Sequence, residues 1–184
     1  MNIELMKKLE DLKMLRGELS AKLGEQIEIK KDQYIQTVKS DFADFFKEKG
    51  FQIDSNDSSV TATYGNLVAR LSHKEPETQF LGCYFVFDLN LKAFDGKEYS
   101  IILSKSEPRS NVSVSFKDPK GPSDSELQKE IESMQTSIKQ SQERLDNFSK
   151  EEWELFIKKD PAERSGLLSK GYRSMIELLS SMIE

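Results

Sequence analysis

The stretch from Phe80 to Leu103 is the most apolar and aromatic run in the chain. From residue 85 onward, one side of this alternation is apolar and consists of Phe85, Phe87, Leu89 and Leu91. A period of two residues with aromatic side chains predicts a β-strand that buries one face. Asp95-Gly96 predicts a tight turn, and residues 99–103 predict the returning strand. We therefore expect an antiparallel hairpin at the centre of the chain.

Further strands are expected on both sides of this hairpin. Residues 60–64 and 67–71 are strand-like and flank Gly65-Asn66, which predicts either a second hairpin or one strand with a bulge. After the hairpin, Val112, Val114 and Phe116 alternate with polar residues and predict a last strand. Together these segments predict an antiparallel meander of four or five strands.

A long helical pattern precedes the strands, over residues 2–49. Its first half carries leucines at the spacing of a coiled-coil seam, namely Leu5, Leu9, Leu12, Leu19 and Leu23. Its second half carries a wider aromatic stripe that suits docking on a sheet, including Phe42, Phe45 and Phe46. Gly50 is a suitable residue to end the helix. The pattern predicts one long helix or two helices, of which the first half projects and the second covers the sheet.

A second helical arm is expected after the break at residues 118–122. Ser123 and Glu126 form a capping-box pattern at its start. Its apolar seam follows alternate spacings of four and three and includes Leu127, Ile131, Met134, Ile138 and Leu145. We expect the two arms to pair antiparallel within one molecule. The alternative is a parallel homodimer in which each arm pairs with its own copy.

The end of the chain is expected to be helical as well. Ser149 and Glu152 form a second capping-box pattern, which predicts a helix start or a bend near Phe148. Asp160-Pro161 predicts the start of a final amphipathic helix. We interpret the apolar residues of this region as a candidate partner-binding surface, because aromatic and methionine side chains suit interfaces. Its members are Trp153, Phe156, Tyr172, Met175, Leu179 and Met182.

These elements predict an α+β fold: a small antiparallel β-meander covered by helices, with coiled-coil-like helical arms at the N- and C-terminal ends. Three segments are expected. Residues 1–33 form a helical arm, residues 34–120 form a domain of one helix and an antiparallel sheet, and residues 121–184 form a coiled-coil-like helix with a helical tail.

Residues that commonly carry catalysis are scarce. His73 is the one histidine, and it lies beside Lys74 in an expected polar loop, where no nucleophile and orienting partner are evident. Cys83 lies in the apolar strand and is expected to be a small buried residue. Glycine-rich phosphate loops and zinc-ligand spacings are absent from the sequence. We therefore expect no catalytic residues, no metal, no cofactor and no enzyme activity.

Charge and composition limit the partners. A net charge of −5 argues against nucleic acid as the main partner, because phosphate binding needs clustered positive charge. Basic residues do gather near one end of the expected sheet: Lys92, Lys97, Lys105, Arg109, Lys117 and Lys120. The start lacks the apolar core of a signal peptide, no apolar run could span a bilayer, and a single cysteine fits a reducing compartment. We therefore expect a cytoplasmic protein without a membrane partner.

The leading functional expectation is a non-enzymatic subunit for protein–protein interaction or assembly, an adaptor that uses its coiled-coil and C-terminal helical surfaces. Its partner would be another protein or a second copy in a homodimer. One alternative is a chaperone-like module that holds another chain on its sheet edge or helical groove. Another is a nucleic-acid-associated accessory factor that uses the basic end of the sheet.

Overall fold

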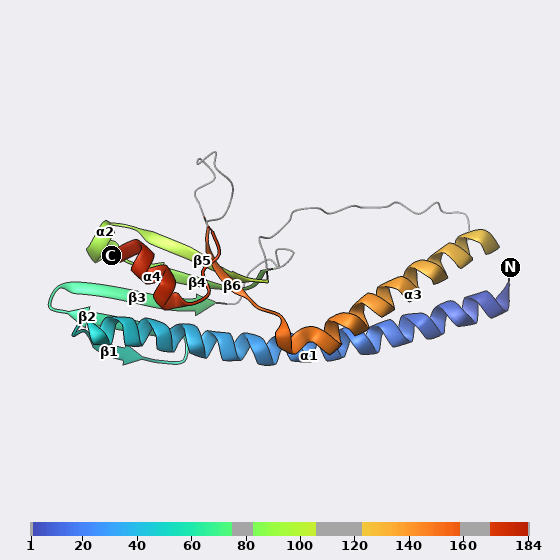
Figure 1. Cartoon of the computed structure of the whole chain (residues 1–184), viewed down its shortest axis with the longest axis horizontal. Helices are drawn as coiled ribbons and strands as arrows, with labels where there is room; N and C mark the ends of the chain where they lie inside the picture. The colour runs from blue at the N-terminus through green and yellow to red at the C-terminus, as the bar shows by residue number, and fades with distance from the viewer. Residues whose placement is uncertain (1, 75–82, 106–122, 159–169, 184) are drawn as a thin grey trace. The chain divides into compact units, whose positions relative to one another are not determined.

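The computed structural model describes residues 2–74, 83–105, 123–158 and 170–183 (Figure 1). It divides into two compact units, each assembled from separated stretches of chain. Unit 1 comprises Met1–Lys30 and Asn111–Glu151, and unit 2 comprises Lys31–Ser110 and Glu152–Glu184. Helix α1 (Ile3–Glu48) is continuous and contributes to both units. The units therefore differ from the three consecutive segments that the sequence suggests.

In unit 1, the first part of α1 lies beside α3 (Asp124–Asn147), which the short 3-10 helix η1 (Phe148–Lys150) follows (Figure 1). The main-chain nitrogen of Asn2 donates to the Asp124 carboxylate at 3.2 Å. Further along both helices, the Arg16 guanidinium lies 3.8 Å from the Met134 sulfur. The residue numbers of the contacting pairs rise along both helices, from 2 with 124 to 16 with 134, so α1 and α3 run parallel. The antiparallel direction that we expected is therefore wrong.

The beginning of α3 matches its sequence signal. The Ser123 hydroxyl accepts from the Glu126 main-chain nitrogen at 3.3 Å, and the Glu126 carboxylate accepts from the Ser123 nitrogen at 2.6 Å. These reciprocal bonds form the expected capping box. The main-chain nitrogen and the hydroxyl of Ser123 both donate to the Glu126 carboxylate, and they hold its pKa below the usual range because they favour the ionised form.

Unit 2 contains a six-stranded sheet in which each strand pairs antiparallel with the next along the chain, in the order β1-β2-β3-β4-β5-β6. Its strands are β1 (Gln52–Ser55), β2 (Ser59–Tyr64), β3 (Leu67–Lys74), β4 (Cys83–Asn90), β5 (Glu98–Ser104) and β6 (Glu154–Ile157). The expected α+β class and antiparallel meander are confirmed, with more strands than predicted. Gly65, at φ +58°, lies in the β2–β3 hairpin turn. The central connection contains a helical turn, α2 (Lys92–Asp95), and is longer than the tight turn expected there.

The sixth strand lies where the sequence suggested helix. Residues 154–157 pair with β5, with Leu155 opposite Leu103 and Ile157 opposite Ile101. The helix start expected for this segment is wrong, because η1 leads into extended chain, whereas the alternative of a bend near Phe148 agrees with the end of α3 at Asn147. Leu155 and Phe156 are consecutive and both buried, so the segment lacks the alternation that identifies a strand. The strand expected at residues 112–116 lies outside the described residues.

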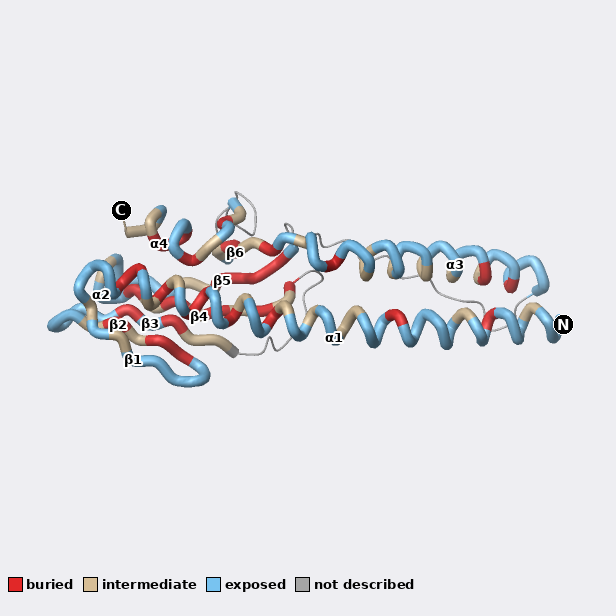
Figure 2. Tube along the Cα trace, turned by 60° about the horizontal axis from the view of Figure 1, so that its bottom comes forward, coloured by how far each residue is buried: buried red, intermediate tan, exposed pale blue. Residues whose placement is uncertain are grey.

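The core of unit 2 lies between one face of the sheet and the second part of α1. Phe42, Phe45 and Phe46 are buried on the helix, as expected, and Phe85, Phe87 and Leu89 are buried on β4. Figure 2 shows the buried stretches of α1 and of the strands in red. Helix α4 (Met175–Ile183) adds three buried side chains: Met175, Leu178 and Leu179. Its first residue lies beside α1, because the Asp41 carboxylate accepts from the Met175 main-chain nitrogen at 3.2 Å.

Candidate functional site

The two-helix arm, defined as α1 up to Lys30 together with α3 and η1, holds the seam residues named from the sequence. Leu9, Leu127 and Ile131 form a buried cluster against which Leu5 and Leu12 pack. Leu19 is also buried. The remaining seam residues are half-buried: Leu23, Met134, Ile138 and Leu145. The seam is thus an apolar contact line between the two helices of one chain.

A second set of apolar residues on α1 remains exposed. Ile3 and Met14 are 65% and 68% exposed. The other exposed large apolar residues of the arm are Met6, Leu15 and Ile29. Ile3 and Met14 are about three helical turns apart and share one face of α1, whereas Leu9 is rotated by about 140° from Met14 toward the seam. Apolar surface therefore remains on α1 after α3 has covered the seam.

The two glycines within α1 have no packing role in the described part of the chain. A methyl group built at Gly17 or Gly24 would meet no atom within 4 Å. Glycine in a helix interior costs about 1 kcal/mol relative to alanine. Since Gly17 is three residues after Met14 and Gly24 is seven further, both lie on the same side of the helix as Ile3 and Met14.

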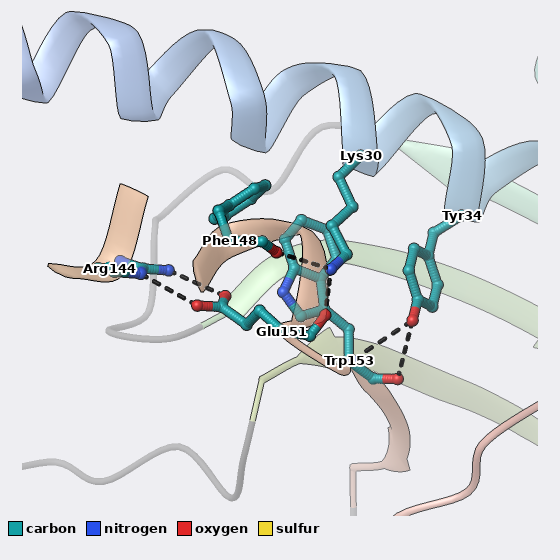
Figure 3. Close-up of polar contacts among 6 residues, drawn as sticks. All are labelled: Lys30, Tyr34, Arg144, Phe148, Glu151 and Trp153. Carbon is teal, nitrogen blue, oxygen red and sulfur yellow. Dashed lines mark hydrogen bonds and ion pairs between the residues drawn. The ribbon is translucent and has the colours of Figure 1, made fainter. Parts of the chain in front are cut away.

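The end of the arm is fastened by polar contacts that the sequence did not predict (Figure 3). The Lys30 ammonium donates to the main-chain oxygens of Phe148, at 3.4 Å, and Glu151, and it lies 5.2 Å from the centre of the Phe148 ring. Arg144 binds the Glu151 carboxylate through two nitrogens, each at 3.1 Å. The Glu151 side chain is only 4% exposed. The Lys30 ammonium thus donates to carbonyl groups at the ends of α3 and η1. Its positive charge is favourable there, because the C-terminal end of a helix carries the negative end of the helix dipole.

The expected partner-binding residues are placed in the core of unit 2. Trp153 stacks on Tyr84, with ring centres 4.0 Å apart, and its main-chain nitrogen donates to the Tyr34 hydroxyl at 3.4 Å (Figure 3). Phe156, Met175 and Leu179 are buried, as is Tyr172, which bridges to Leu155; Met182 is half-buried. A partner would reach most of these side chains only after α4 or β6 had moved.

A carboxyl group of α1 with a perturbed pKa, that of Asp41, lies at the start of α4. Burial raises the pKa of Asp41 above its usual range, and the hydrogen bond from the Met175 nitrogen opposes that shift in part. The Ser174 hydroxyl accepts from the Glu177 nitrogen at 3.1 Å, and the Glu177 carboxylate accepts from the Arg173 nitrogen at 2.9 Å. The N-terminus of α4 is therefore capped both locally and by α1.

His73 lies in strand β3, so the loop expected for it is wrong. The strand continues to Lys74 because it pairs with β4, placing His73 opposite Phe87. Its Nε2 atom lies 2.8 Å from the main-chain oxygen of Asp57, and its ring lies 5.4 Å from the ring of Phe85. Since a carbonyl oxygen only accepts, Nε2 carries the proton. This contact fastens the β1–β2 turn.

Cys83 is buried, as expected, with its sulfur 3.5 Å from the main-chain oxygen of Phe85. Burial raises the pKa of its thiol above the ordinary value, which lowers the fraction of reactive thiolate at neutral pH.

Among the described residues, no group of three or more histidine, cysteine, aspartate and glutamate side chains is arranged to hold a metal ion.

Of the expected basic cluster, Lys92 is paired with Glu98 at 2.9 Å, and Lys97 and Lys105 are exposed. Its other members, Arg109, Lys117 and Lys120, lie outside the described residues.

None of the helices in the described ranges has the length and apolarity needed to cross a membrane.

Comparison with protein-family models, with curated proteins and with solved structures gave no significant match to this chain, so its candidate sites rest on its own residues.

Proposed function

We propose that this chain is a non-enzymatic assembly subunit, an adaptor that binds another protein through the exposed face of α1 in the two-helix arm. The supporting observation is the exposure of Ile3 and Met14 on the side of α1 that α3 leaves uncovered. Large apolar side chains that share one face of an exposed helix favour burial against another chain.

Two further features support this assignment. Methionine adapts its shape to different contact surfaces, and Met6 and Met14 both lie in the exposed set. Gly17 and Gly24 leave open space beside the helix axis, which allows a partner helix to approach closely without a clash. Within the described chain, the cost of these glycines to α1 is not offset by any packing.

The charges of the same face favour a protein partner over nucleic acid. Lys7 and Glu10 lie between Ile3 and Met14, so the face carries both signs of charge. A phosphate backbone needs clustered positive charge and would be repelled by the acidic positions. A protein helix with interspersed charges could satisfy both signs at the rim of an apolar contact.

The test replaces both apolar positions with charge, in the double variant Ile3→Glu/Met14→Glu. A matched control, Gln128→Glu/Gln135→Glu, adds two acidic residues on the exposed side of α3. We expect both variants to keep the helical circular dichroism of the parent. Light scattering would report self-association, and capture from the native source at low and high salt would report other protein partners.

Loss of association in the α1 variant alone would support the proposal. An α1 variant that keeps the oligomeric state and every salt-tolerant partner of the parent would contradict it. Association that disappears at high salt in the parent itself would also contradict it, because apolar burial is not screened by salt.

A further inference from the structure

A polar trough lies on the sheet face that points away from the core of unit 2. The cavity measures about 490 Å³, and its lining on β3, β4 and β5 includes Arg70, Ser72, Asp88, Asn90, Glu98 and Ser100. A volume of this size is in the range of small-molecule sites, which is about 300–1,000 Å³.

Strand register explains how these side chains converge. Arg70 is opposite Asn90, which is opposite Glu98, and this makes one row across three strands. In the neighbouring row, Ser72 is opposite Asp88, which is opposite Ser100. Between the two rows, Leu71 on β3 and Leu89 on β4 are apolar and buried in the core, whereas Tyr99 on β5 is half-buried. Because side chains alternate between faces, both polar rows face the trough.

The two ends of the trough carry opposite charge. Arg70 is exposed. Among the described residues, its guanidinium forms no ion pair within 4 Å. Two carboxylates lie toward β4 and β5, on Asp88 and Glu98. Glu98 accepts from the Asn90 amide at 2.7 Å and pairs with Lys92 at 2.9 Å, so it is held in place. Asp88 and Arg70 are diagonal neighbours, at a typical Cα separation of about 7–8 Å.

We propose that this trough binds a small zwitterion, a molecule with a free carboxylate and a free ammonium a few ångströms apart, such as a short peptide. The planar guanidinium of Arg70 suits two-point binding of the carboxylate. Asp88 accepts from the ammonium, and the hydroxyls of Ser72 and Ser100 flank it. A simple anion is repelled by the two carboxylates, and a simple cation by Arg70. This inference does not depend on the two-helix arm.

The probe is the dipeptide Ala-Ala, followed by amide NMR of the full chain. Two blocked forms separate the charges: N-acetyl-Ala-Ala lacks the ammonium, and Ala-Ala-amide lacks the carboxylate. We expect saturable shifts at residues 70, 72, 88 and 90 with Ala-Ala at about 10 mM, which is tenfold above a Kd of about 1 mM. Each blocked form should bind at least about tenfold more weakly, because it loses one charged hydrogen-bonding group.

The variants Arg70→Gln and Asp88→Asn should each weaken Ala-Ala binding about tenfold or more. Arg173→Gln, at an exposed arginine outside the trough, is the matched control and should bind like the parent. Arg70 is exposed, so Arg70→Gln should fold, and a melting curve checks both variants. Arg70→Lys should recover part of the affinity, since it restores charge without the two-point geometry. Three results would each overturn the proposal. They are the absence of saturable shifts with Ala-Ala, equally tight binding of a blocked form, and tighter binding of the uncharged sugar maltose.

Discussion

The side-chain ammonium of Lys30 donates a hydrogen bond to the main-chain oxygen of Glu151, 121 residues further along the chain. A second bond from the same group reaches the oxygen of Phe148. One lysine on α1 therefore holds the end of α3 and the turn that follows it. This contact closes the two-helix arm at the point where the chain leaves it.

Replacing Lys30 with methionine should destabilise the protein. The variant keeps most of the apolar length of the side chain but leaves two carbonyl oxygens without their donor, and each such loss costs about 1–3 kcal/mol when the group is shielded from water. We expect a lower midpoint of urea unfolding, followed by circular dichroism. Lys22→Met, at an exposed lysine of the same helix, is the control and should unfold like the parent. Equal midpoints for both variants would contradict the role of Lys30.

The parallel direction of the arm can be tested by disulfide formation in a Cys83→Ala background. Leu12 packs against the cluster that contains Ile131, so cysteines at these two positions should join within one chain. A disulfide needs Cα atoms within about 7 Å. Cysteines at Leu12 and Ile138 should not join, because seven residues along α3 add about 10 Å. Rapid bridging of the second pair, or bridges formed only between chains on a non-reducing gel, would show that the arm is arranged differently.

Helix α4 should be essential to the stability of unit 2. Leu179 is fully buried, so Leu179→Ala should cost about 2–5 kcal/mol of unfolding free energy. Ile176 is on the same helix but 43% exposed, and Ile176→Ala should cost much less. Removal of the chain from Met175 onward should unfold the sheet unit, as measured by thermal melting. A truncated protein that melts like the parent would mean that α4 is a docking surface and not part of the core.

One tyrosine should titrate at unusually high pH. Burial, together with the hydrogen bond that its hydroxyl donates to the Asp95 carboxylate, raises the pKa of Tyr99 to about 12 from an ordinary value of 10.0. Because the folded pKa is raised, the stabilising contribution of the neutral phenol is fully present below pH 10 and is lost as the pH rises toward 12.

The measurement is the ultraviolet difference between the parent and Tyr99→Phe during an alkaline titration. Asp95→Asn should bring the Tyr99 midpoint down, because the neighbouring negative charge is gone. Asp54→Asn, at an exposed aspartate on β1, is the control and should leave it unchanged. A Tyr99 midpoint near 10 in the parent would show that the hydroxyl is not bonded to Asp95 in solution.

Local signals determined much of the fold. The capping box at Ser123, the helical pattern over residues 2–49 and the alternation along β4 each involve residues close in sequence. A helix cap, an apolar helical stripe and the alternation of a pleated strand each depend on residues within a few positions of one another. The aromatic stripe at Phe42 was correctly expected in the core, because a stripe of that width suits docking on a sheet better than pairing in a two-stranded coiled coil.

Tertiary structure decided the rest. The direction of α3 relative to α1 depends on which ends meet, and a heptad seam is compatible with either direction. Residues 154–157 became a strand because β5 offered an open edge, and their burial on both faces removed the alternation that would have identified them. Lys30, Arg70 and Asp88 looked like ordinary charged residues of solvated elements. Lys30 meets carbonyl groups that are more than a hundred residues away, and Arg70 and Asp88 lie on neighbouring strands. Only the folded chain brings each of these residues to its partners.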